Sequence, residues 1–143
     1  GAVFDVATGS AGSRCVPIRL SDTKAMLVWY FGTDLKAVIL NVSGTTVSAG
    51  TAVTIIASAT ANAAAALSST VVLCVYAVTA GRYAVLLTVA TDTITAGTAV
   101  LLSTTAPPTP IELQTSSATR GILVFCNSSG YPSVSAVEYS ASI

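Results

Sequence analysis

The chain of 143 residues carries six Lys and Arg against six Asp and Glu, contains no His, and is 52% hydrophobic but only 8% charged. Soluble domains have about 25% charged residues, so Ser and Thr must supply much of the polar surface. Without His, the sequence lacks the usual general base near neutral pH and the commonest metal ligand. Zero net charge also disfavours a surface that binds nucleic-acid phosphates. We therefore expect one non-enzymatic domain, 1–143, with no catalytic residue, cofactor, metal or nucleic-acid partner.

The high apolar content does not predict a membrane span. The longest uninterrupted apolar run, residues 71–78, has eight residues, whereas a spanning helix needs about 20. Strands of a lipid-facing barrel keep one polar face, but the strongest apolar runs here have none. Burial between layers of protein explains these runs better.

The first elements in chain order are short strands. A Gly/Ser-rich loop, residues 9–13, precedes a weak strand at 17–20; no Lys follows the loop to hold a phosphate. An apolar strand at 25–31 and an alternating strand at 37–42 come next. A turn leads to a third strand at 46–48, whose pairing continues, after an Ala-Gly bend, through 51–56.

An Ala-rich segment, residues 61–67, follows. Ala is the best helix former, but the aligned part of the next unit contains Pro107, Pro108 and Pro110, which exclude a shared helix. We predict a loop and poor strand here.

The same strands return further along the chain. The second set is expected at 71–78, 83–89, 93–95 and 98–102, followed by a weak strand near 111–114. A third apolar strand is expected at 121–126.

A repeat of about 47 residues explains this recurrence. Leu20-Ser21-Asp22-Thr23 aligns with Leu67-Ser68-Ser69-Thr70, and the offset then holds without a gap. The best match places residues 46–53 (TVSAGTAV) on residues 93–100 (TITAGTAV). The duplication is the most specific signal in the sequence.

A third copy is present but split. Residues 119–125 match 23–29 and 70–76, and the chain stops at Ile143 before an Ala-Gly-Thr-Ala-Val segment. Residues 1–19 resemble the ends of the other units, so we divide the chain into the end of a split repeat (1–19), repeats at 20–66 and 67–112, and a first half at 113–143. Because residue 1 is Gly and not Met, we expect a processed chain or a piece of a longer one.

One aromatic stands at the same place in each unit: Trp29, Tyr76 and Phe125. They could form a ring of platforms for sugars, but each ends an apolar run, so we favour a repeated core layer. Strands that are apolar on both faces are covered on both faces, as in sheets stacked like propeller blades.

The predicted fold is thus all-β, with about three four-stranded antiparallel repeats in a propeller-like arrangement. Propellers usually need 4 to 8 blades, so three units require a second copy or a longer chain. A threefold β-prism or β-trefoil is the alternative.

The pattern of residues 67–76 (LSSTVVLCVY), followed by an alternating strand and residues 93–100, resembles the tandem propeller-like repeats of tail, fibre and capsid-decoration proteins of tailed bacteriophages. The resemblance implies a virion structural protein that forms a homo-oligomer and also binds other virion proteins. It transfers no ligand site, because the repeated residues are those of the core.

Chemistry-bearing residues are scattered along the sequence. Acidic residues fall at turns or strand ends, where Asp favours turn formation, and the basic residues near strand starts are expected to be solvated. The acidic set is Asp22, Asp34, Asp92, Glu112 and Glu138, and the basic set is Arg19, Lys24, Arg82 and Arg120.

The three cysteines form no CxxC motif. We expect Cys74, inside an apolar strand, to be a buried thiol. Cys15, beside Arg14, is the one expected to meet solvent, and the odd count that Cys126 completes argues against a disulfide framework.

The sequence therefore favours a non-enzymatic structural protein of a virion. The alternative is a lectin-like adhesin that binds host-surface glycans through exposed aromatics such as Tyr83 or Tyr131.

Overall fold

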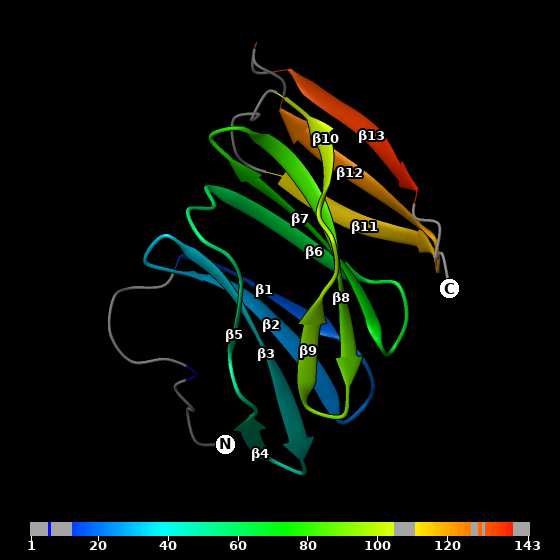
Figure 1. The fold of residues 1–143 in the computed structure, drawn as a ribbon. Coiled ribbons are helices and arrows are strands. Elements are labelled where there is room, and N and C mark those ends of the chain that lie inside the picture. The colour runs from blue at the N-terminus through cyan, green and yellow to red at the C-terminus, as the bar shows by residue number, and fades with distance from the viewer. Residues whose placement is uncertain (1–5, 7–12, 105–110, 127–128, 130, 139–143) are drawn as a thin grey trace.

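The computed structural model describes residues 6, 13–104, 111–126, 129 and 131–138. This part of the chain forms 13 strands in three antiparallel sheets and contains no helix. The predicted all-β class is confirmed. Figure 1 shows the sheets in chain order along the molecule, from β1–β5 near one end, through β6–β10, to β11–β13 at the other.

Sheet 1 consists of β1 (Ser13–Arg19), β2 (Lys24–Phe31), β3 (Asp34–Ser43), β4 (Thr46–Ala49) and β5 (Val53–Ile56). The strands β1, β2, β3 and β4 pair in that order. β5 also pairs with β3, along a different part of that strand from β4. Two-residue turns join β2 to β3 and β3 to β4. Gly32 and Gly44 begin these turns with φ of 65° and 58°, a region that L side chains rarely adopt.

Sheet 2 consists of β6 (Ala61–Ala66), β7 (Val71–Val78), β8 (Gly81–Ala90), β9 (Thr93–Ala96) and β10 (Val100–Ser103). It repeats the connections of sheet 1, with β9 and β10 both paired to β8. The strands β3, β4 and β5 begin 47 residues before β8, β9 and β10, so the aligned sequences take up the same strand order.

The prediction of a loop and poor strand at 61–67 was wrong, because β6 is a regular strand paired with β7 along its whole length. Its small side chains pack in both directions: Ala64 belongs to the core between sheets 1 and 2, and Ala63 to the core between sheets 2 and 3. Ala stabilises this strand through packing on two neighbours, which outweighs its low strand propensity.

Sheet 3 consists of β11 (Ile111–Ser117), β12 (Arg120–Cys126) and β13 (Pro132–Glu138), paired in that order. The described sheets thus have five, five and three strands rather than four each. The weak strands expected at the ends of units pair instead with the strand that follows them, as β1 does with β2 and β11 with β12. Each sheet therefore begins one strand earlier than the sequence repeat.

The buried hydrophobic side chains form two clusters, each lying in an interface between two sheets. The first interface, between sheets 1 and 2, contains Ile18, Leu20, Met26, Val28, Tyr30, Leu35, Ala37, Ile39, Ala59, Ala64, Val72, Cys74, Tyr76, Val85, Leu87, Val89 and Ile94. The second interface, between sheets 2 and 3, contains Ala63, Leu73, Val75, Ala77, Ala84, Leu113, Leu123 and Val137. Alternate residues of β7 enter the two interfaces, so sheet 2 is covered on both faces, as its apolar strands predicted.

Arg14 links the first strands of all three sheets. From β1, its Nε donates to the backbone oxygen of Asn62 in β6 at 2.8 Å, and its Nη2 donates to Glu112 Oε1 in β11 at 2.8 Å. The edges formed by β1, β6 and β11 therefore lie close together, which fixes how the sheets are stacked.

Candidate functional site

The aromatic residues of the repeat are largely core residues. Trp29 and Tyr76 are each 4% exposed, and Phe125 is half-buried against the second interface. This confirms the core interpretation for Trp29 and Tyr76. The three rings do not present the exposed platforms that a sugar-binding ring requires.

The ring of Phe125 instead contacts a buried cation, the guanidinium of Arg82. The guanidinium carbon of Arg82 lies 3.9 Å from the centroid of the Phe125 ring, and Arg82 is only 4% exposed. The expectation that Arg82 is solvated was wrong, because alternation along β8 points it with Ala84 and Leu86 toward sheet 3. Burial lowers the pKa of this guanidinium, but it stays charged at neutral pH.

The two tyrosines considered for glycan binding have different surroundings. Tyr83 is half-buried and stacks on Tyr76, with ring centroids 5.8 Å apart. Tyr131, directly before β13, is 68% exposed. Only Tyr131 presents a broad aromatic surface to solvent.

Most charged groups that the sequence singled out form ion pairs. These pairs are Arg19 with Asp22, Lys24 with Asp92, Arg14 with Glu112, and Arg120 with Glu138. Arg19 and Arg120 are exposed, as expected, whereas Lys24 is half-buried, and Asp34 is half-buried at the start of β3. Within the described ranges, no three His, Cys, Asp or Glu residues lie close enough to hold a metal ion.

The best-defined polar contact joins sheet 1 to sheet 2. Asp92 Oδ1 accepts from Asn41 Nδ2 at 3.0 Å and from Lys24 Nζ at 3.1 Å. Lys24 Nζ also donates to the backbone oxygen of Thr91 at 2.5 Å. The hydrogen bond from Asn41, followed by that from Lys24, lowers the pKa of the Asp92 carboxyl.

The cysteines behave as predicted where they are described. Cys15 is exposed and Cys74 is buried, both as free thiols; the side chain of Cys126 lies outside the described residues. Burial raises the pKa of Cys74 to about 12, so this group remains a protonated thiol at neutral pH and is a poor nucleophile.

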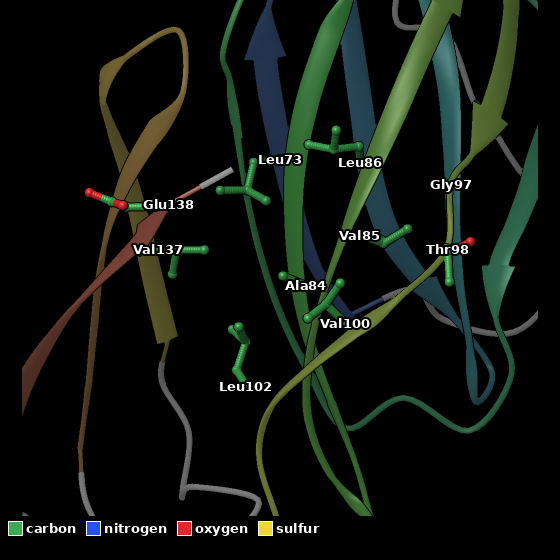
Figure 2. A pocket seen from close by; sticks show the side chains of 10 residues that line it. All are labelled: Leu73, Ala84, Val85, Leu86, Gly97, Thr98, Val100, Leu102, Val137 and Glu138. Carbon is green, nitrogen blue, oxygen red and sulfur yellow. The ribbon is translucent and has the colours of Figure 1, made fainter. Parts of the chain in front are cut away.

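A small pocket opens between sheets 2 and 3 (Figure 2). Its volume is about 130 Å³, and it is lined by Leu73, Ala84, Val85, Leu86, Gly97, Thr98, Val100, Leu102, Val137 and Glu138. Ligand pockets usually measure about 300–1,000 Å³, whereas a cavity of about 150 Å³ holds one benzene. The pocket is therefore too small for a sugar or nucleotide.

The first interface has a glycine, Gly50, at the position that corresponds to Gly97 in the pocket wall. Gly50, 47 residues before Gly97, lies against the turn that joins β8 to β9. A Cβ on Gly50 would be 3.2 Å from the backbone oxygen of Asp92 in that turn. In the part of sheet 3 that the structure describes, β13 is not followed by a strand equivalent to β9. Because of its small volume, the pocket is best explained as a packing feature between the sheets.

Exposed apolar side chains lie on β10, at Val100, Leu101 and Leu102, and on the outer face of sheet 3, defined by the alternate residues Ile122, Val124 and Val134. Ile122, Val124 and Val134 are 41%, 39% and 70% exposed. The intervening residues Gly121 and Leu123 face sheet 2. Figure 1 shows β12 and β13 at the end of the stack.

The repeat identifies this face with surfaces that are covered elsewhere. Aligning the apolar strands places Ile122 on Leu73 and Met26, and Val124 on Val75 and Val28. Those four counterparts are between 0% and 2% exposed, because the next sheet packs on them. Among the described residues no further sheet packs on the outer face of sheet 3, so this face repeats an interface surface in exposed form.

The described residues contain no helix long and apolar enough to cross a membrane. No family model, no curated protein and no solved structure matches the chain.

Proposed function

We propose that the protein is a non-enzymatic structural component of a virion, as a fibre, tail or capsid-decoration protein, and that it acts by assembly with copies of itself and with other virion proteins. The observation that carries the proposal is the outer face of sheet 3, which presents Ile122, Val124 and Val134 to solvent. Val124 and Val134 are direct cross-strand neighbours on this face, and large contiguous apolar patches mark interaction sites in soluble proteins.

The uses of the reactive side chains support the same proposal. Arg82 packs on Phe125, the Cys74 thiol is buried with a raised pKa, and Asp92 links two sheets. These groups act in packing and cohesion between sheets. The propeller-like closure, with a threefold β-prism or β-trefoil as the alternative, is part of this proposal.

The test combines light scattering with particle purification. The purified protein should show a molar mass above that of one chain at micromolar concentration, and an antibody should detect it in virus particles purified on a density gradient. A protein that stays monomeric and is absent from the particles would contradict the proposal.

The second candidate, a lectin-like adhesin, rests on the exposed ring of Tyr131. A glycan array probed with the assembled protein would test it, with Tyr131→Ala as the variant. Glycan binding that this substitution abolishes would favour the adhesin, whereas binding to no glycan would count against it.

A further inference from the structure

We infer that the first interface binds a buried water molecule, which the side-chain amide of Asn62 on β6 and the hydroxyl group of Tyr30 on β2 hold between sheets 1 and 2. Asn62 is 0% exposed and Tyr30 is 6% exposed, so protein encloses both side chains. Such a site goes beyond the proposed assembly function and would exist whether or not the protein is part of a virion.

The polar atoms of these two side chains are buried without a protein partner. Among the residues that the structure describes, neither the amide oxygen and nitrogen of Asn62 nor the hydroxyl of Tyr30 makes a hydrogen bond. Burial of such groups without a replacement hydrogen bond is costly. Buried polar side chains in native proteins therefore bond to protein or to ordered water, and here a ligand that both donates and accepts is expected.

The two side chains face each other across the first interface. Asn62 lies on the same side of β6 as Ala64, which packs between sheets 1 and 2, whereas Ala63 packs between sheets 2 and 3. Alternation along the strand therefore points Asn62 toward sheet 1. Tyr30 belongs to the same interface from sheet 1, so its long side chain points across the gap of about 10 Å between stacked sheets.

The edge strands place the two residues at the same end of their sheets. β1 lies next to β2, and Ser13 on β1 is the cross-strand partner of Tyr30. Arg14, the following residue, donates from Nε to the backbone oxygen of Asn62 at 2.8 Å. Asn62 therefore lies within the reach of one arginine side chain from the strand position beside Tyr30.

The surroundings of the Tyr30 hydroxyl agree with this placement. Burial, followed by the neighbouring Cys74, raises the pKa of the hydroxyl, whereas Arg14 lowers it. Electrostatic effects weaken with distance, so the hydroxyl lies close to both groups. Cys74 is two residues from Tyr76, the cross-strand partner of Asn62. The hydroxyl and the Asn62 amide thus belong to one buried polar cluster in an otherwise apolar interface.

Water fits the donors and acceptors of this cluster. Asn62 offers an acceptor oxygen and an NH2 donor, and the Tyr30 hydroxyl both donates and accepts. A buried water makes about three hydrogen bonds to groups of this kind. The amide and the hydroxyl are neutral at neutral pH, and the nearby charge of Arg14 is already paired with Glu112. The next residue of β6 that faces sheet 1 is Ala64, whose methyl group fills little of the space beside the amide.

A crystal structure that shows ordered solvent tests the site directly. We expect a water oxygen within about 3.2 Å of the Tyr30 hydroxyl oxygen and of one side-chain oxygen or nitrogen of Asn62. A direct hydrogen bond between the two side chains, or no water between them, would overturn the inference.

A double variant, Tyr30→Phe with Asn62→Val, tests the site in solution. It removes the hydroxyl and the amide but keeps the aromatic ring and places a good strand former on β6. Oxygen-17 magnetic relaxation dispersion, which counts long-lived buried waters, should show at least one water fewer than in wild type. Tyr83→Phe is the matched control, because Tyr83 packs against the same interface but is half-buried, and it should keep the wild-type count. An unchanged count in the double variant would contradict the inference.

The urea midpoint of Tyr30→Phe alone is an independent readout that needs only a conservative change. A hydroxyl that bonds a buried water stabilises the fold, so its removal should lower the midpoint, and Tyr83→Phe should lower it less. A hydroxyl buried without a partner destabilises the fold, so an unchanged or raised midpoint in Tyr30→Phe would overturn the inference. None of these results depends on whether the protein is found in virus particles, so the proposed function is tested separately.

Discussion

The first and second interfaces are built from aligned strands, yet they are stabilised differently. Leu35 in the first interface aligns with Arg82 in the second interface. Likewise, Val72, which faces sheet 1, aligns with Gly121, which faces sheet 2. The polar contact of Asp92 with Lys24 belongs to the first interface alone, because the residue aligned with Lys24 is Val71. A repeated strand pattern can therefore keep its stacking geometry while individual contacts change.

The largest expected difference comes from leucines at the centre of each interface. Leu87 in the first interface is 0% exposed and Leu123 in the second is 1% exposed. Leu→Ala substitutions in cores cost about 2–5 kcal/mol, less where the site can collapse. Leu87→Ala should fall near the upper limit and Leu123→Ala near the lower, because a pocket lies beside the second interface. Urea unfolding checks this; equal losses would show that the two interfaces are equally well packed.

Gly121→Ala tests how closely sheet 3 approaches sheet 2. A Cβ at this position would lie 2.9 Å from Leu113 Cδ1 and 3.1 Å from Leu73 Cδ2. Overpacking of this kind costs about 1–3 kcal/mol, and we expect the lower part of that range because both atoms end flexible side chains. The same urea titration measures it, with Gly97→Ala as the control, where the nearest atom would be 3.5 Å away. A loss no greater than that of the control would contradict the close approach.

Arg82→Leu gives the second interface the residue of the first. Arg82 is 4% exposed, and among the described residues its Nε has no hydrogen-bond partner. The substitution removes a cation–π contact worth about 0.5–2 kcal/mol but also removes the cost of burying a charge. We expect thermal stability close to wild type for Arg82→Leu and clearly lower for Arg82→Ala, which leaves a void. Equal losses in both variants would show that the cation itself is essential.

The smallest expected effect is a pH dependence confined to the first interface. The pKa of Asp92 is lowered in the folded protein by Asn41 and Lys24, so its carboxylate stabilises the fold above the unfolded value of about 3.9. That contribution is lost as the pH falls through the folded pKa. Wild type should exceed Asp92→Asn in unfolding midpoint at neutral pH, and the difference should shrink below about pH 4. A difference independent of pH would exclude the carboxylate as its cause.

Much of this architecture could be predicted from the sequence, because apolar periodicity specifies strands directly. Strands that are apolar on both faces, such as β7, predicted a sheet covered on both sides. The Ala-rich strand β6 could not be predicted in this way, since its stability comes from contacts with two other sheets. Arg82 was missed because its charge suggested solvent, although its alternation with Ala84 and Leu86 could have placed it inside.

The candidate surface was harder to predict than the fold. Residues 122–124 (ILV) resemble 73–75 (LCV) in character, and nothing local distinguishes the covered strand from the exposed one. Exposure at Ile122 and Val124 depends on which element follows sheet 3 in space. Such a difference becomes visible only when the sheets are assembled in three dimensions.

The order of strand pairing has a consequence for folding. Every described strand pair joins neighbours in the chain or strands with one other strand between them, so each sheet can form from short loops with a low closure entropy. Stacking of sheets then brings together residues far apart in the sequence. Until sheet 3 forms, Leu73 and Val75 of sheet 2 lack their cover, so a nascent chain should expose an aggregation-prone surface late in synthesis.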